Sequence, residues 1–264
     1  MPSPFAHPAA AIPLTRTGLV LSGLIVGSVA PDLGYLLPLS NPYFMNTAAG
    51  LILFDVPAGI VLLWLFHSLA KWPLLSAAPD SLQRRLYGPA QGFSFKPPRR
   101  FALILLSLLV GSATHVIWDS FTHEWGWMVE QISFLRIPLG GMPLFVVLRD
   151  LGTAAGIWLL VYWFVRWIAA APQSDRLPAR FSPKVRTLFL SLTALSLAAV
   201  EGATIFGRFG IGAHLLHQHG VMHGLTIEAA AVLSFYAAAY WFAWMVAFRK
   251  TGGASGSSIE PLKP

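Results

Sequence analysis

Six long apolar stretches are the feature of this 264-residue chain that most constrains its fold. Each approaches the roughly 20 apolar residues that a helix needs to cross the core of a bilayer. Only 11% of the residues are charged, against about 25% in a soluble domain. The sequence therefore predicts an all-α, polytopic membrane helix bundle with about six transmembrane helices, and it excludes a soluble globular or a disordered chain. The stretches lie at about residues 17–37, 48–70, 101–118, 150–170, 186–206 and 222–247.

Positive charges are distributed very unequally between the segments that connect these stretches. Fifteen of the 18 Lys and Arg residues lie within residues 1–16, 71–100, 166–186 and 248–264, which are the two ends of the chain and the regions around the connections after the second and fourth stretches. Only Arg136, Arg149 and Arg208 lie on the opposite side. The positive-inside rule then places both termini in the cytoplasm, and it accounts for the net charge of +7 without a nucleic-acid partner. We expect one six-helix membrane domain over residues 1–250, in contact with the lipid bilayer, and a flexible cytoplasmic tail over residues 251–264.

The chain contains no cysteine, which excludes disulfides, thiolate metal sites and a cysteine nucleophile. Any metal must therefore be held by His and carboxylate side chains. In the predicted orientation, most acids and imidazoles gather at the outer end of the bundle, where we expect a water-filled cavity. Ionisable side chains inside a span are costly and are therefore candidates for a functional site.

The most informative segment is residues 111–123, at the outer end of the third stretch. Within it, His115, Asp119 and His123 recur every four residues, so on a helix they project from nearly one face. Imidazole and carboxylate are ligands that suit zinc, and also manganese or iron. The spacing therefore predicts a divalent metal site, with zinc as the first candidate. The alternative is that His115 only bonds a neighbouring helix, while Asp119 and His123 lie in the headgroup region.

A second feature is the Ala30-Pro31-Asp32 step, which ends a first stretch already punctuated by glycine. Pro31 breaks the helix and frees backbone groups, which is tolerated at membrane depth only where protein or water satisfies them. Asp32 is placed at the same outer face as His115 and Asp119, and we expect it to be a further ligand or a bridging carboxylate. The alternative is an ordinary Pro-Asp turn that faces solvent.

The order of these residues resembles a family of uncharacterised bacterial membrane proteins. That family is similar in pattern to the membrane-bound metal-dependent hydrolases, and more remotely to the zinc-dependent phospholipase C and P1-nuclease group. The resemblance covers about the first 150 residues and implies a multi-pass protein of the bacterial inner (plasma) membrane. The residues that carry it are His7, Pro31-Asp32, His67-Ser68 and the block Thr114-His115-x-x-x-Asp119-x-x-x-His123. The resemblance implies metal ligation by His7, Asp32, His67, His115 and Asp119.

Two features depart from the hydrolase pattern. The hydrolases carry additional His or Asp beside their Pro-Asp, whereas the Leu-Gly-Tyr that follows Asp32 adds none. The charge-derived orientation also places His7 and His67 near the inner face, a span away from Asp32. Either the first helix is re-entrant and the second ends early, or these two histidines do not share the site.

Two further groups of polar residues are secondary candidates. The loop between the fifth and sixth stretches carries four histidines within residues 214–223. They are either solvated loop residues or, on a helix, same-face pairs suited to a metal. Arg149-Asp150, Glu201 and Arg208 are interpreted as interhelical ion pairs, because charges buried in a membrane need partners.

These patterns support three functions from different classes. In a metal-dependent hydrolase acting on a lipid phosphoester at the outer membrane surface, His115, Asp119 and Asp32 hold a divalent ion. His123 is then the catalytic general acid or base. In a metal or proton transporter, the same side chains form an entry site and the broken first helix belongs to the pathway. In a membrane assembly protein, the polar residues only lock helices together, and Asp119→Ala is tolerated.

Overall fold

The computed structural model describes residues 6–36 and 42–175, together with the single positions Thr187, Ser191, Leu195 and Trp241. The described chain is mostly helical and divides into two units, which are treated separately below. The first unit comprises residues 1–64 and 93–171, and the second comprises residues 65–92 and 172–264. Apart from the four single positions, the following predicted features lie outside the described residues: the spans at 186–206 and 222–247, the histidines at 214–223, Glu201, Arg208 and the tail at 251–264.

Three helical runs are long and apolar enough to cross a membrane: Ala48–Ala77, Pro98–Gln131 and Leu144–Ala170. They correspond to the second, third and fourth predicted stretches, and each extends several residues beyond the apolar part. These runs confirm the prediction of a helical membrane protein. The total of six spans and the cytoplasmic placement of both termini remain predictions.

The first of these runs alternates between α-helical and π-helical turns. A π-helical turn inserts one extra residue into the helix, and such turns are frequent at functional sites. The run consists of α4 (Ala48–Gly50), the π-helical η5 (Leu51–Asp55), α5 (Val56–Leu65), the π-helical η6 (Phe66–Ala70) and α6 (Lys71–Ala77). In the second unit, α7 (Asp80–Gln91) follows α6, and Trp72, Leu75 and Tyr87 form an apolar core there.

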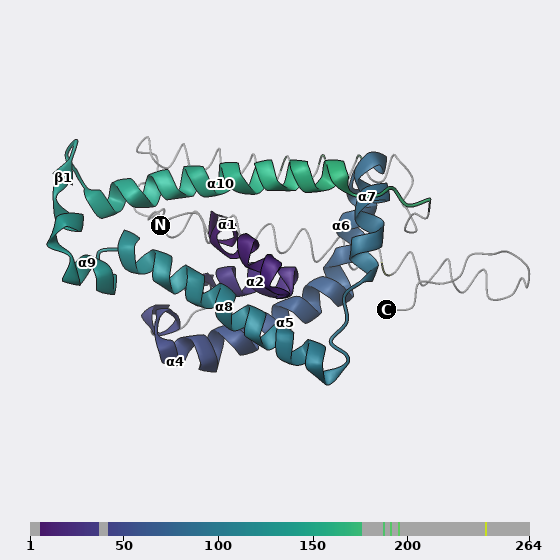
Figure 1. Ribbon diagram of the computed structural model, residues 1–264, viewed down its shortest axis with the longest axis horizontal. Helices are drawn as coiled ribbons and strands as arrows, with labels where there is room; N and C mark the ends of the chain where they lie inside the picture. Colours follow the sequence, from purple (N-terminus) through teal and green to yellow (C-terminus); the bar gives the residue numbers. More distant parts are fainter. Residues whose placement is uncertain are drawn as a thin grey trace, which may run out of the picture. The chain divides into compact units, whose positions relative to one another are not determined.

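The other two runs are joined by a short irregular segment (Figure 1). The second run contains α8 (Pro98–Thr122) and α9 (Trp127–Gln131), and the third is α10 (Leu144–Ala170). Between them lie the 3-10 turn η7 (Ser133–Arg136) and a hairpin of two antiparallel strands. The strands are β1 (Pro138–Leu139) and β2 (Met142–Pro143), and the turn between them is made by Gly140 and Gly141, both with positive φ.

The first predicted stretch does not form one long helix. It folds as α2 (Leu21–Val29), η3 (Ala30–Asp32) and α3 (Leu33–Leu36). The elements α1 (Pro8–Ala11) and η2 (Ile12–Thr17) precede it, and η4 (Pro42–Asn46) follows. Gly18 ends η2 in a left-handed conformation with φ of 86°, and Pro31 converts the end of α2 into a 3-10 turn. At a rise of about 1.5 Å per residue, α2 is only about 14 Å long, roughly half of a bilayer core.

The short helix α2 packs closely against α8 (Figure 1). Gly27 and Gly111 permit this approach, because a Cβ on Gly27 would overlap the backbone of Leu108, and a Cβ on Gly111 would overlap the backbone of Leu24. Small residues spaced to let two backbones meet are the usual basis of helix packing in membranes. Beside this crossing, Leu63, Ile104 and Leu108 form the buried apolar core of the first unit.

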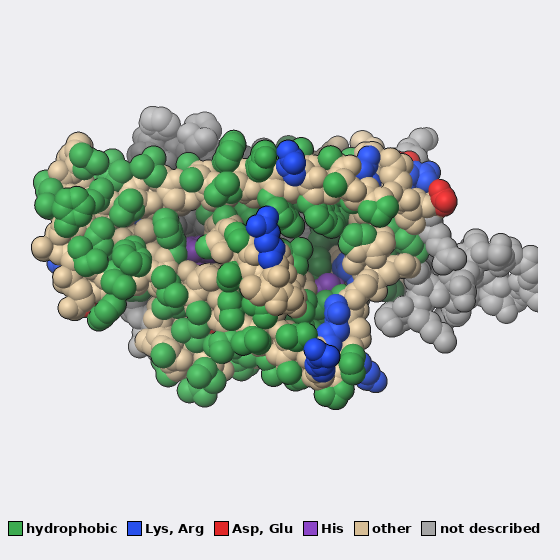
Figure 2. Space-filling view, viewed as in Figure 1, with side chains coloured by type: hydrophobic (Ala, Val, Ile, Leu, Met, Phe, Trp, Pro, Cys, Tyr) green, Lys and Arg blue, Asp and Glu red, His purple; other side chains and the backbone are tan. Residues whose placement is uncertain are grey.

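Much of the molecular surface is apolar, as Figure 2 illustrates for one face. Helix α10 carries many exposed large apolar side chains, among them Leu151, Trp158, Val161 and Tyr162. In water such a surface would be an aggregation hazard, whereas in a bilayer it contacts lipid chains. The exposure of these apolar side chains and the lengths of the helices thus both indicate a membrane protein.

Candidate metal centre

Four ionisable side chains from three separate segments meet inside the first unit. We call them the His/Asp cluster: His7 at the start of α1, Asp32 in η3, and His115 and Asp119 in α8. All four residues are buried, with exposed fractions of 8% or less. Their positions follow from the α2–α8 crossing, which brings the 3-10 turn after α2 against the second half of α8.

The break at Pro31 prepares the backbone for this contact. Because Pro31 has no N–H, it cannot donate to the carbonyl of Gly27, and this carbonyl instead accepts from Ala30 N–H and from the hydroxyl of Ser112 at 3.0 Å. The next carbonyl, of Ser28, lies 2.8 Å from Nδ1 of His115. Protein groups of α8 therefore satisfy the backbone groups near the break, as the sequence predicts for a proline at membrane depth.

The bond to Ser28 also fixes the chemistry of the His115 ring. A carbonyl oxygen can only accept, so Nδ1 carries the proton, and in the neutral ring Nε2 keeps its lone pair. A ligand histidine typically donates its second nitrogen to a carbonyl or carboxylate in this way. His115 is therefore held in the tautomer and orientation that a metal ligand needs.

The Nε2 atom of His115 faces the carboxylates of the cluster. It lies 3.2 Å from Oδ2 of Asp119 and 3.8 Å from Oδ1 of Asp32. Nε2 of His7 lies 3.7 Å from Oδ1 of Asp119, and the His7 ring stacks on the His115 ring with centroids 3.8 Å apart. One potential ligand atom from each of His7, Asp32 and His115 lies within 4.8 Å of the other two. Three potential ligand atoms therefore lie close together, and Asp119 lies within ion-pair distance of both histidines.

Several atoms that point into this space make no hydrogen bond. Among the described residues, His7 Nε2, Asp32 Oδ2, His115 Nε2 and Asp119 Oδ1 are buried and without a hydrogen-bond partner. Buried polar atoms are normally satisfied, and each exception needs an explanation. A divalent cation bound by two imidazoles and two carboxylates would satisfy all four and would neutralise the carboxylates. The donor set therefore fits a zinc, manganese or iron ion.

The surroundings keep His7 in the form that binds metals. Burial is the largest cause that lowers the pKa of His7, from 6.5 to about 3, and the neighbouring His115 acts in the same direction. His7 is therefore neutral near pH 7, and metal ligation requires a neutral imidazole.

His123 lies at the edge of the cluster, at the C-terminal end of α8. Its Nδ1 is 3.5 Å from Oδ2 of Asp119 and 3.3 Å from the Asp119 carbonyl, and its ring stacks on Trp125. Its side chain is 11% exposed, whereas that of His115 is fully buried. This position at the rim suits proton exchange with a molecule that enters from outside.

The sequence left the relation of His7 and His67 to the site open, and the structure answers this question for His7. His7 is in the cluster, so the alternative that keeps it away from the site is wrong for this residue. The physical reason is the shortness of α2, which lets the segment before it return to the level of Asp32. His67 belongs to η6 in the second unit, and its predicted role as a metal ligand remains a prediction.

The predicted ion pairing of Arg149 and Asp150 needs correction. Nε of Arg149 donates to Oδ1 of Asp150 at 2.8 Å, so these neighbours pair within α10 rather than between helices. The side chain of Asp150 is 57% exposed, so it needs no buried partner. In contrast, the sequence placed Asp55 in the outer half of the second stretch but gave it no role in the site, where it is completely buried. The available signal was an isolated acid within an otherwise apolar run.

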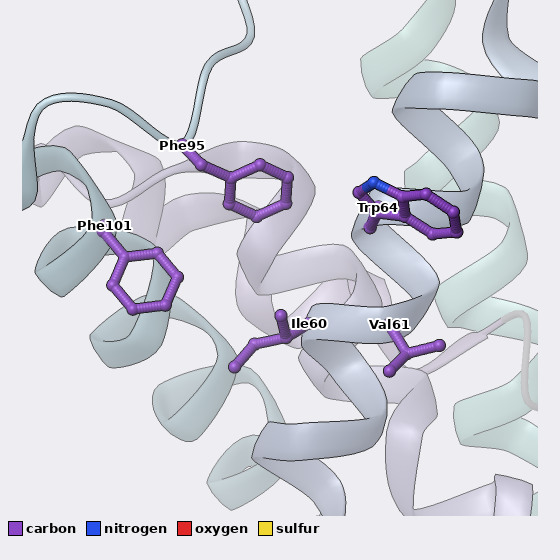
Figure 3. Close-up of a pocket in the computed structure, with 5 residues that line it drawn as sticks. All are labelled: Ile60, Val61, Trp64, Phe95 and Phe101. Atoms are coloured by element: carbon purple, nitrogen blue, oxygen red, sulfur yellow. The ribbon is translucent and has the colours of Figure 1, made fainter.

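A pocket elsewhere in the first unit has a different character (Figure 3). It has a volume of about 300 Å³ and is lined by Ile60, Val61, Trp64, Phe95 and Phe101. These side chains provide neither metal ligands nor acid-base groups. The His/Asp cluster is therefore the better candidate for chemistry.

Comparison with known proteins gives a family match over most of the chain. Residues 1–247 match the family described as Domain of unknown function (DUF4184). Neither a curated protein nor a solved structure matches the chain. The matched region contains the whole His/Asp cluster.

Proposed function

This chain belongs to the family described as Domain of unknown function (DUF4184), and we propose that it is a membrane-embedded, metal-dependent hydrolase. In this proposal the His/Asp cluster holds a divalent cation, zinc before manganese or iron, and the substrate is a lipid phosphoester at the outer membrane surface. The resemblance to the membrane-bound metal-dependent hydrolases points in the same direction.

One observation carries the proposal: unpartnered, buried nitrogen and oxygen atoms of His7, Asp32, His115 and Asp119 converge. A cluster that only locked helices together would be expected to satisfy these atoms by hydrogen bonds, because unsatisfied polar atoms are costly in a low-dielectric interior. A bound cation removes this cost and accounts for the fixed tautomer of His115. The bond from His115 Nδ1 to the Ser28 carbonyl, which leaves Nε2 directed at the cluster, makes simple helix locking the weaker explanation.

In this proposal, the residues of the His/Asp cluster and His123 have different roles. A divalent cation lowers the pKa of a bound water and polarises a phosphoryl oxygen. His7, Asp32, His115 and Asp119 would hold the ion, and the bond from His115 to the Ser28 carbonyl would keep its ring in place. His123, at the rim, would donate or accept the proton that the leaving group or the nucleophile requires. Asp119 would orient His123, whose Nδ1 it contacts.

A lipid substrate is supported by the segment that follows α8. This segment begins directly after His123 and exposes a series of apolar side chains outside the two long helices that it joins. Aromatic side chains in such segments are typical of the membrane-water interface, where lipid headgroups lie. The exposed residues are Trp127, Ile132, Phe134, Ile137, Leu139 and Met142.

The proposal is tested by metal content and hydrolysis measured on the same detergent-purified protein. The wild type is loaded with zinc or manganese, desalted and analysed by elemental mass spectrometry, and phosphoester cleavage is then assayed on phospholipid vesicles. We expect bound metal and activity in the wild type and the loss of both in Asp119→Asn, which preserves side-chain size. Asp150→Asn, which removes an exposed carboxylate of the same unit, should retain both.

The alternatives give different results in this experiment. Bound metal without hydrolysis, together with metal uptake into proteoliposomes, would favour a transporter, for which the interrupted helix α2 is the supporting observation. Substoichiometric metal that Asp119→Asn does not change would contradict the hydrolase proposal and favour an assembly protein.

A further inference from the structure

A fifth ionisable side chain, Asp55, is buried in the first unit without a visible partner. Its exposed fraction is 0%, and neither carboxylate oxygen makes a hydrogen bond among the described residues. It lies in the run Ala48–Ala77, which is long and apolar enough to cross a membrane. A charged carboxylate in such a place is costly unless something neutralises it. Asp55 therefore calls for a positive partner or a functional explanation.

The position of Asp55 connects it to the His/Asp cluster. It is the last residue of the π-helical segment η5, which packs against η3 and α8, the elements that carry Asp32 and His115. The carboxylate of Asp55 also interacts electrostatically with both of these side chains. The extra residue of a π-helical turn shifts the side chains that follow it relative to a regular α-helix. The local helix type thus contributes to the placement of Asp55.

The His/Asp cluster and Asp55 together offer more potential ligand atoms than one zinc ion usually binds. Zinc in proteins usually takes four ligands, and His7, Asp32, His115 and Asp119 already supply four unpartnered atoms. Asp55 adds two more unpartnered oxygens. A single tetrahedral ion would therefore leave the carboxylate of Asp55 without a ligand role.

The charges lead to the same conclusion. Asp32, Asp55 and Asp119 carry three negative charges when ionised, more than one divalent cation neutralises and fewer than two supply. Two divalent ions would leave a small positive excess, which would favour an anionic phosphoester. Enzymes that cleave phosphoesters often use two metal ions about 3.5–4 Å apart.

We propose that Asp55 is a ligand of a second divalent cation, which binds beside the first one in the His/Asp cluster. This inference rests on the proposed function and adds one ligand and one ion to it. The second ion would share a carboxylate of the cluster with the first, and Asp55 would be the ligand that belongs to the second ion alone.

The test compares ion stoichiometry in three variants and the wild type. Each protein is purified in detergent, incubated with excess zinc or manganese, desalted and analysed by elemental mass spectrometry. We expect two ions per chain in the wild type, one in Asp55→Asn, and fewer than one in Asp119→Asn. The control Asp150→Asn, an exposed carboxylate of the same unit, should bind two.

Each other outcome overturns a defined part of the argument. Two ions in Asp55→Asn would overturn the assignment of Asp55 as a ligand, and one ion in both the wild type and Asp55→Asn would overturn the second site. Both results would leave the proposed function intact. No ion in the wild type would overturn the proposed function itself. Asp55→Asn keeps the size of the side chain and removes a buried charge, so size-exclusion chromatography should confirm a folded protein. If it does not fold, isothermal titration of the wild type decides, because a stoichiometry of one ion per chain overturns the second ion.

Discussion

Helices α8 and α10 are both long and apolar, yet they differ in how the protein uses them. In the most apolar 18-residue window of each, 33% of the residues are buried for α8 and 6% for α10. Helix α8 buries Gly111, Ser112, His115 and Asp119, while α10 buries only Gly156 and Ile168. Hydropathy alone therefore identifies both helices, whereas the buried small and polar residues distinguish α8, which carries two residues of the His/Asp cluster.

Metal removal should produce the largest difference between α8 and α10. If a cation joins η3 to α8, it stabilises this region, and at a free concentration about 100 times its Kd the contribution is about 2.7 kcal/mol. Chelation should then accelerate amide hydrogen exchange in α2 and the second half of α8 by up to about 100-fold. Exchange in α10 should change little. Hydrogen-deuterium exchange followed by mass spectrometry measures both helices in one sample.

The control for this prediction is the variant Asp119→Asn. Its exchange in α2 and α8 should already be fast without chelator and should not respond to it. Equal acceleration in α10 and α8 would contradict a local role of the metal.

Truncation of a leucine should give the next largest difference. Leu108 in α8 is 0% exposed, whereas Leu159 in α10 is 48% exposed. Leu108→Ala should lower the free energy of unfolding by about 2–5 kcal/mol, because it removes buried contacts and leaves a cavity. Leu159→Ala should cost well under about 1 kcal/mol, because lipid or detergent fills the space. Thermal unfolding in detergent provides the measurement, and similar losses at both sites would show that α10 is packed as tightly as α8.

Much of the site could be predicted from the sequence because its elements are local patterns. The four-residue spacing of His115 and Asp119 requires only that the segment is helical, and it is. Pro31 predicted a break whose carbonyl groups need partners, and Ser112 and His115 supply them. Helical spacing and the hydrogen-bonding needs of the backbone are set by nearby residues, so a single sequence is enough to predict both.

Other parts of the site depend on contacts between distant segments and could not be predicted in this way. The sequence placed His7 a span away from Asp32, because the first stretch was counted as a full crossing. The 9-residue α2 covers only about half of that distance. Asp55 was placed among the acids of the outer end but given no role in the site, because its relation to the cluster depends on how η5 packs against η3. Periodicity within a segment contains no information about such packing.

Adding one methyl group at the α2–α8 crossing should have a smaller but clear effect. A Cβ on Gly111 would overlap backbone atoms of Leu24 and Ser28, which cannot rotate away. Gly111→Ala should therefore destabilise the protein by about 1–3 kcal/mol, the usual range for overpacking. Gly88, in α7, has open space around a built Cβ, and Gly88→Ala should be neutral or stabilising by up to about 1 kcal/mol. Equal thermal stability of the two variants would show that the helices do not meet at Gly111.

The smallest difference should come from two hydroxyl groups that bond in different ways. Ser112 in α8 donates to the Gly27 carbonyl of another helix at 3.0 Å, whereas Thr153 in α10 donates to the Arg149 carbonyl of its own helix at 2.9 Å. Hydrogen bonds between helices in a membrane contribute about 0.6 kcal/mol on average. Ser112→Ala should cost about this amount, since Pro31 has no N–H to replace the lost donor.

Thr153→Ala should cost less than Ser112→Ala, because the Arg149 carbonyl lies inside a regular helix and keeps its backbone bond. Thermal unfolding of both variants, repeated with and without zinc, measures the two costs. In Ser112→Ala the weaker α2–α8 contact should also reduce the stabilisation by zinc, because Gly27 and Ser28 precede the turn that positions Asp32. Zinc should stabilise Thr153→Ala as much as the wild type. An unchanged response in Ser112→Ala would mean that the cation site does not depend on the crossing of these helices.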